Sequence, residues 1–123
     1  MLPLRPGCII EAEIVDQNGY KKKRPAVIAS EIPENEDGPI VVFAITGKVK
    51  SPQQPNEIPL SADPDGKLGT HMKKDCVVAC WWPNVICRRD ILGRYGELSV
   101  AQIRIMTHFF RNLKPQLLPK GKP

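Results

Sequence analysis

An arginine and a threonine stand at the ends of two apolar segments and could together hold a phosphate group. Arg24 opens the segment RPAVIAS, and Thr46 closes the segment PIVVFAIT. A guanidinium offers phosphate oxygens a rigid fork of donors, and a threonine hydroxyl adds another. If the two segments pair as strands, both groups would meet at one rim and stabilise charge developing on a phosphodiester. A surface cation and an ordinary strand end remain the simpler interpretation.

Other catalytic patterns are missing from the sequence. It has no HExxH motif, no glycine-rich phosphate loop and no nucleophile elbow. His71 and His108 are interpreted as exposed or structural. The four cysteines contain no CxxC pair, so we expect neither a metal site nor a cofactor; they are Cys8, Cys76, Cys80 and Cys87.

Short strands and one terminal helix account for most of the chain. Alternation and apolar runs predict strands over 8–15, 24–30, 39–46, 57–60 and 75–82, with one more short strand before residue 98. Asn18-Gly19 predicts a tight turn, and Pro25 must sit at a strand start or on an edge. The last element is a helix over about 100–113, since Ser99 and Gln102 form a capping box.

The apolar positions of this helix are Val100, Ile103, Met106, Phe110 and Leu113, and Pro115 is expected to end it. The element order predicts a mostly β protein with a C-terminal helix, built as a small barrel of short, mainly antiparallel strands. We expect a single domain over residues 1–113 and a flexible tail over 114–123.

The charge of the chain is compatible with nucleic acid without requiring it. The 123 residues carry a net charge of +5, of which Lys114, Lys120 and Lys122 supply three. The start of the chain, MLPLRPG, lacks the apolar stretch of a signal peptide, and no segment has the length of a membrane span. A cytoplasmic protein with reduced thiols is therefore expected.

The chain resembles the MazF/PemK family of toxins from toxin–antitoxin pairs. The resemblance runs from about Pro6 to Leu113 and rests on the order and spacing of several segments rather than on one motif. These segments are RPGCII, KRPAVIAS, VVFAITGK, KKDCVVACWWPNVI and ILGRYGELSVAQI.

This resemblance implies an SH3-like barrel, a homodimer and a metal-independent, sequence-specific endoribonuclease acting on single-stranded mRNA. Arg24 and Thr46 fall on the family's catalytic arginine and threonine. In the family, a ribose 2′-hydroxyl attacks the adjacent phosphate and leaves a 2′,3′-cyclic phosphate and a 5′-hydroxyl. Since arginine stays protonated at neutral pH, we expect Arg24 mainly to stabilise charge and, as a second role, to donate a proton. We expect Thr46 to hold a non-bridging oxygen. The sequence identifies no general base.

Tyr20, Lys23, Lys48, Trp81 and Trp82 are the candidate RNA-binding residues. The lysines before Arg24 could guide RNA or form a solvated loop. One tryptophan could stack on a base, worth about 1–3 kcal/mol. Alternatively, one fills the core and the other packs in a dimer interface. Alternation along a strand predicts that the two indoles face opposite sides.

The sequence departs from the family pattern at two places. Lys22 stands where the family often has glycine, and residues 81–87 lack its usual polar groups. An antitoxin segment rich in acidic and apolar residues is the expected partner. Two alternatives stay open: a non-catalytic toxin of this fold that binds a protein such as DNA gyrase, or an RNA-binding module that has lost cleavage.

Overall fold

The computed structural model describes residues 4–16, 18–47 and 56–117, the last four of them by their backbone. Lys48 therefore lies outside the described residues. The elements are β1 (Cys8–Val15), β2 (Lys21–Ile28), β3 (Ile40–Thr46), β4 (Glu57–Leu60), β5 (Cys76–Ile86), the short 3-10 helix η1 (Arg88–Asp90), β6 (Ile91–Glu97) and α1 (Val100–Leu117).

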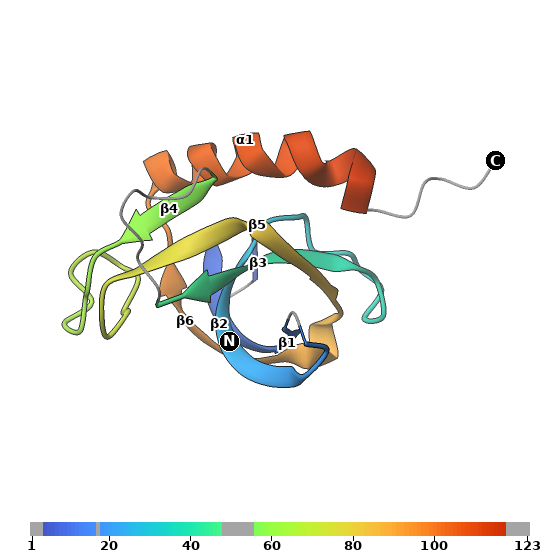
Figure 1. Ribbon diagram of the computed structural model, residues 1–123, viewed down its shortest axis with the longest axis horizontal. Helices are drawn as coiled ribbons and strands as arrows, with labels where there is room; N and C mark the ends of the chain where they lie inside the picture. The colour runs from blue at the N-terminus through green and yellow to red at the C-terminus, as the bar shows by residue number, and fades with distance from the viewer. Residues whose placement is uncertain (1–3, 17, 48–55, 118–123) are drawn as a thin grey trace.

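The strands form one curled sheet in the order β4-β5-β3-β2-β1-β6, and every neighbouring pair is antiparallel. The helix α1 lies across the sheet over β4 and β5, and the β1–β2 hairpin wraps around beneath (Figure 1). The mostly β architecture with a C-terminal helix is thus as the sequence predicts.

The hairpin between β1 and β2 contains the predicted turn. The backbone N–H of Asp16 donates to the carbonyl of Tyr20 at 2.8 Å, and Gly19 adopts a φ of 85°. Only glycine enters that region at little cost. Because the turn closes at once, β2 starts at Lys21 rather than at the predicted residue 24. The lysines before Arg24 are therefore part of a strand and not a loop.

The first half of β2 has a strand neighbour on one side only within the described chain. β2 pairs with β1 as far as Val15↔Lys21, but with β3 only from Ala26 to Ile28. The N–H of Ala29 donates to β3, and alternation turns the nitrogen of Pro25 to the same side. The proline therefore breaks no ladder bond, and the expected edge position holds locally although β2 is an inner strand.

Two groups of buried side chains lie on the two sides of the sheet. Val41, Phe43 and Ile45 point into the core shared with α1, whereas Ile40 and Val42 enter the second cluster. All residues of β3 except its last are buried. The prediction of a central strand buried on both faces is confirmed.

The helix begins as predicted and ends later. The N–H of Ser99 donates to Gln102 Oε1 at 2.9 Å, and the N–H of Gln102 donates to Ser99 Oγ at 3.2 Å. The helix runs to Leu117, so the prediction that Pro115 ends it is wrong. Proline has a helical φ, and its cost in the last turn is the backbone hydrogen bond that it cannot donate. Val100, the first of the apolar positions at helical spacing, is 68% exposed in the first turn.

β5 is longer than the sequence predicts. It continues through Pro83 to Ile86, and Pro83 pairs with Phe43. The register shifts within this ladder, because Phe43 faces Pro83 while Ile45 faces Val78. Such a β-bulge accommodates a proline and re-aims the side chains next to it.

Candidate functional site

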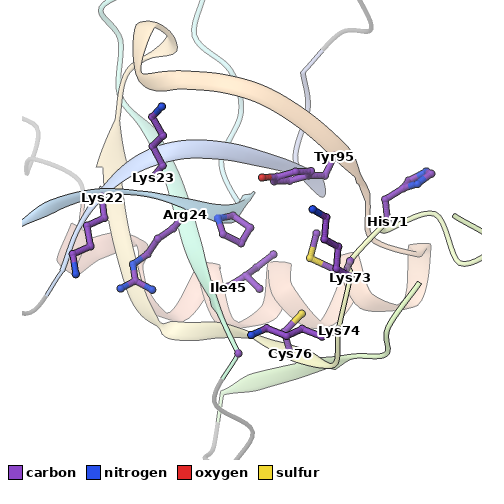
Figure 2. A pocket seen from close by; sticks show the side chains of 12 residues that line it. Lys22, Lys23, Arg24, Ile45, His71, Lys73, Lys74, Cys76 and Tyr95 are labelled. Carbon is purple, nitrogen blue, oxygen red and sulfur yellow. The ribbon is translucent and has the colours of Figure 1, made fainter. Parts of the chain in front are cut away.

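A pocket of about 540 Å³ opens beside the half of β2 that β3 leaves unpaired. The strands β2 and β3 form one part of its wall, and the segment 71–76 forms the facing part (Figure 2). The described residues that line it are Lys22, Lys23, Arg24, Pro25, Ile45, Gly47, His71, Met72, Lys73, Lys74, Cys76 and Tyr95.

Positive charge dominates the lining. Lys22, Lys23 and Arg24 lie on one side, and Lys73 and Lys74 lie across from them (Figure 2). No carboxylate belongs to the described lining. Cations that converge on a partly enclosed space attract anions more strongly than the same charges on a flat surface. The pocket is therefore suited to a polyanion.

Arg24 is half-buried at the rim of this pocket. Its guanidinium carbon lies 5.3 Å from the centroid of the Trp82 ring, over the ring face. Its Nε–H is buried and meets no hydrogen-bond acceptor among the described residues. An orphaned buried donor costs about 1–3 kcal/mol, and a catalytic role is one explanation for such a group in a native protein. The side chain of Arg24 is thus held in a defined position, and Arg24 is not simply the last residue of a solvated run of lysines.

Thr46 ends β3 and does not itself line the pocket, but its place relative to Arg24 follows from the strand register. If the register that pairs Ala26 with Ala44 continued by two residues, Arg24 would stand opposite Thr46. The neighbours of Thr46 in the chain, Ile45 and Gly47, both line the pocket. Residues opposite each other in an antiparallel pair point to the same face, so the splayed strand ends offer a guanidinium and a hydroxyl at one rim.

Lys74 approaches the end of β3 from the other side of the pocket. A Cβ built on Gly47 would lie 3.4 Å from Lys74 Nζ. The ammonium group therefore lies over the backbone next to Thr46. A side chain at position 47 would force the lysine to move.

Asp63 organises the loop that carries Lys73 and Lys74. Its carboxylate is buried and accepts hydrogen bonds from the backbone N–H groups of Leu68, Thr70 and His71, at 2.9, 3.1 and 3.0 Å. Burial alone would raise the pKa of Asp63, but these three donors hold the pKa below its ordinary value. The loop is fixed by one ionised side chain.

Residues 5–111 match a sequence family described as "PemK-like, MazF-like toxin of type II toxin-antitoxin system". The chain belongs to this family. Among solved structures, the Mycobacterium tuberculosis toxin MazF-mt6 is similar at 23% identity with a TM-score of 0.63, covering 90% of this chain and 97% of that chain. This likeness shows the fold. No curated protein matches the chain.

The RNA-binding residues predicted for this MazF/PemK-like toxin are only partly brought together. Lys23 lines the pocket. Trp82 lies under Arg24, and Trp81 is 42% exposed beside it. Tyr20 is exposed in the β1–β2 turn and does not line the pocket.

The expected opposition of the two indoles is wrong. Their ring centroids lie 6.1 Å apart at an interplanar angle of 18°. The irregular register of β5 explains the difference, because the period-2 alternation of a strand is lost at a bulge. Trp82 also packs partly against the second core cluster.

Sequence reasoning missed the far side of the pocket. His71, Lys73, Lys74 and Tyr95 line it, although only KKDC offered a hint in the sequence. The hydroxyl of Tyr95 donates to Glu11 Oε2 at 3.1 Å. The pKa of Tyr95 is raised mainly by burial and also by this carboxylate. Burial also raises the pKa of Cys76, which keeps this thiol protonated at neutral pH.

No disulfide joins Cys8, Cys76, Cys80 and Cys87 in the described part of the chain. Within the described ranges, no three His, Cys, Asp or Glu side chains gather as they would around a metal ion. In the same part of the chain, no helix combines the length and the hydropathy that crossing a membrane requires.

Proposed function

We propose that the protein is a metal-independent, sequence-specific endoribonuclease toxin that cleaves single-stranded RNA at the pocket beside Arg24. One observation carries the proposal: Arg24 lines a pocket whose described lining has five lysine and arginine side chains and no carboxylate. Thr46 stands between two residues of that lining, and a continued β2–β3 register would bring it opposite Arg24. Membership in a family of type II toxins supports it.

The reaction needs only groups that the substrate and the pocket supply. The ribose 2′-oxygen attacks the adjacent phosphorus, a 2′-O–P bond forms, and the P–O5′ bond breaks. The products are a 2′,3′-cyclic phosphate and a 5′-hydroxyl. The 2′-hydroxyl gives its proton to a general base that stays unassigned, and the 5′-oxygen takes up a proton. Arg24 is the candidate donor of that proton.

Arg24 stabilises the charge on the phosphorane, and Thr46 holds a non-bridging oxygen. Losing one preorganised donor to a developing oxyanion costs about 100- to 1,000-fold in rate. Lys73 and Lys74 hold neighbouring phosphates from the opposite side. They contribute to binding more than to the chemical step.

The test is cleavage of a long RNA with little secondary structure in excess chelator. Wild type is compared with Arg24→Ala, with Thr46→Val and with Arg111→Ala, which removes an exposed charge from α1. We expect discrete fragments ending in cyclic phosphate from wild type and Arg111→Ala, with at least 100-fold slower cleavage by Arg24→Ala. Intact RNA with folded wild type, or equal cleavage by all variants, refutes the proposal.

The competing function is a toxin that acts by binding a protein such as DNA gyrase. The exposure of Trp81 favours it, since exposed aromatic side chains are typical of protein interfaces. Arg24→Ala discriminates between the two functions. Cells expressing Arg24→Ala should survive if the nuclease kills them and should still die if a protein contact does.

The type II toxin family implies an antitoxin as partner. We place an acidic antitoxin segment over the same pocket, because its cations offer the complementary charge. The inhibited complex should therefore neither cleave nor bind RNA. The homodimer and the cytoplasmic location expected from the sequence stay predictions.

A further inference from the structure

We infer that Trp82 is a positioning residue for Arg24: the indole supports the guanidinium from one face and occupies none of its in-plane N–H donors. The inference rests on the proposed nuclease function. It is carried by the 5.3 Å separation between the guanidinium carbon and the Trp82 ring centroid. A cation over an aromatic face is attracted by the ring's quadrupole.

The ion-paired arginines elsewhere in the described chain are supported differently from Arg24. Within the described chain, Arg5 and Arg94 pair with Glu97, and Arg89 pairs with Asp37. None of these ion pairs involves Arg24. The pKa of Asp16 is lowered mainly by the backbone N–H of Tyr20, and Arg24 adds only a smaller long-range contribution.

An aromatic face and a carboxylate restrain an arginine in different ways. A carboxylate occupies the in-plane N–H donors and cancels the charge, so a phosphate must first displace it. An indole occupies only the flat face of the guanidinium. Both the fork of donors and the net charge therefore remain available to the substrate.

A series of contacts fixes Trp82 in turn. The Trp81 Nε1–H donates to Glu57 Oε2 at 2.8 Å, which ties the outer indole to β4. Trp81 stacks on Trp82 with centroids 6.1 Å apart. The contacts thus run from Glu57 through Trp81 and Trp82 to Arg24. The guanidinium of Arg24 is therefore held in place by packing against an indole rather than by an opposite charge.

The bulge in β5 is what makes the series possible. Between the pairs Phe43↔Pro83 and Ile45↔Val78, the segment of β5 contains more residues than the facing segment of β3. Both tryptophans lie in that excess. In a regular strand their rings would point to opposite faces, and Trp82 could not be supported by its neighbour.

The test compares Trp82→Phe, which keeps an aromatic face, with Trp82→Leu, which does not. Removing a cation–π contact corresponds to about a 2- to 30-fold loss. We expect kcat to fall by that factor in Trp82→Leu with KM little changed, and to recover in part in Trp82→Phe. Urea unfolding of each variant confirms that the comparison is between folded proteins.

A double-mutant cycle separates support of Arg24 from direct stacking on RNA. The single-turnover rate of RNA cleavage is measured for wild type, Trp82→Leu, Arg24→Ala and the double variant. If Trp82 acts through Arg24, its substitution has no further effect once Arg24 is alanine. Additive losses, or wild-type kcat in Trp82→Leu, overturn the inference. Failure of the nuclease proposal shows separately, as intact RNA with wild type.

Discussion

The two lysines on the loop side of the pocket allow the sharpest test of polyanion binding. We consider replacing both Lys73 and Lys74 by alanine. Both side chains are exposed, and neither takes part in an ion pair within the described chain. Their loss should leave the fold intact while removing two of the five lysine and arginine side chains in the lining.

The size of the effect follows from counterion release. Each phosphate contact on a single strand contributes about −0.7 to the slope of log K against log salt. With all five cations engaged, affinity would fall by about 130-fold between 50 and 200 mM salt. With three engaged, the fall would be about 20-fold. These figures are upper limits, since they count one phosphate for each cation.

The assay is fluorescence anisotropy of a labelled 2′-O-methyl RNA, titrated at several salt concentrations. The matched control is Arg104→Ala with Arg111→Ala, which removes two exposed positive charges from α1 and leaves the pocket unchanged. We expect the salt slope to become shallower by about 1.4 only in the lysine double variant. Equal slopes for the two double variants would refute the assignment of the pocket as the RNA site.

Two further predictions concern the scaffold of the pocket. The pKa of Asp63 is lowered in the folded protein, so ionised Asp63 stabilises the fold above its ordinary pKa of 3.8, and this stabilisation is lost as the pH falls through the folded pKa. The difference in melting temperature between wild type and Asp63→Asn should therefore shrink from pH 7 to pH 2. A constant difference would contradict this. Gly96→Ala places a Cβ against the carbonyl oxygen of Gly69 and should cost about 1–3 kcal/mol in urea unfolding. Gly93→Ala, with nothing within 4 Å of the added Cβ, should cost under about 0.5 kcal/mol. Similar costs for the two variants would count against the tight contact.

The parts of the fold that the sequence predicts are those specified locally. The turn after β1 needs Gly19, and the start of α1 needs Ser99 and Gln102, so each can be inferred from a few neighbouring residues. The limits of β5 depend instead on its ladder with β3. Pro83 indicates a break in the sequence, yet the bulge lets the strand continue past it.

The residues of the candidate site likewise fall into those that local sequence patterns identify and those that depend on tertiary structure. Arg24 and Thr46 stand at ends of apolar segments, where sequence patterns are informative. The positions of Lys73 and Lys74 depend on a loop that Asp63 folds through backbone hydrogen bonds, and periodicity does not describe such a loop. The contact between Arg24 and Trp82 depends on the irregular register of β5, which no local pattern specifies.

One feature of the sheet connects the architecture to the proposed chemistry. Pro25 has no N–H for a ladder with β3, and at this residue β2 leaves its inner neighbour. Had the two strands stayed paired, their backbones would lie about 5 Å apart and the pocket would be filled. Because they splay, Arg24 rests over an indole at an open rim, and Lys74 reaches the end of β3 from the opposite side. Pro25 thus helps to create the open pocket at whose rim Arg24 lies.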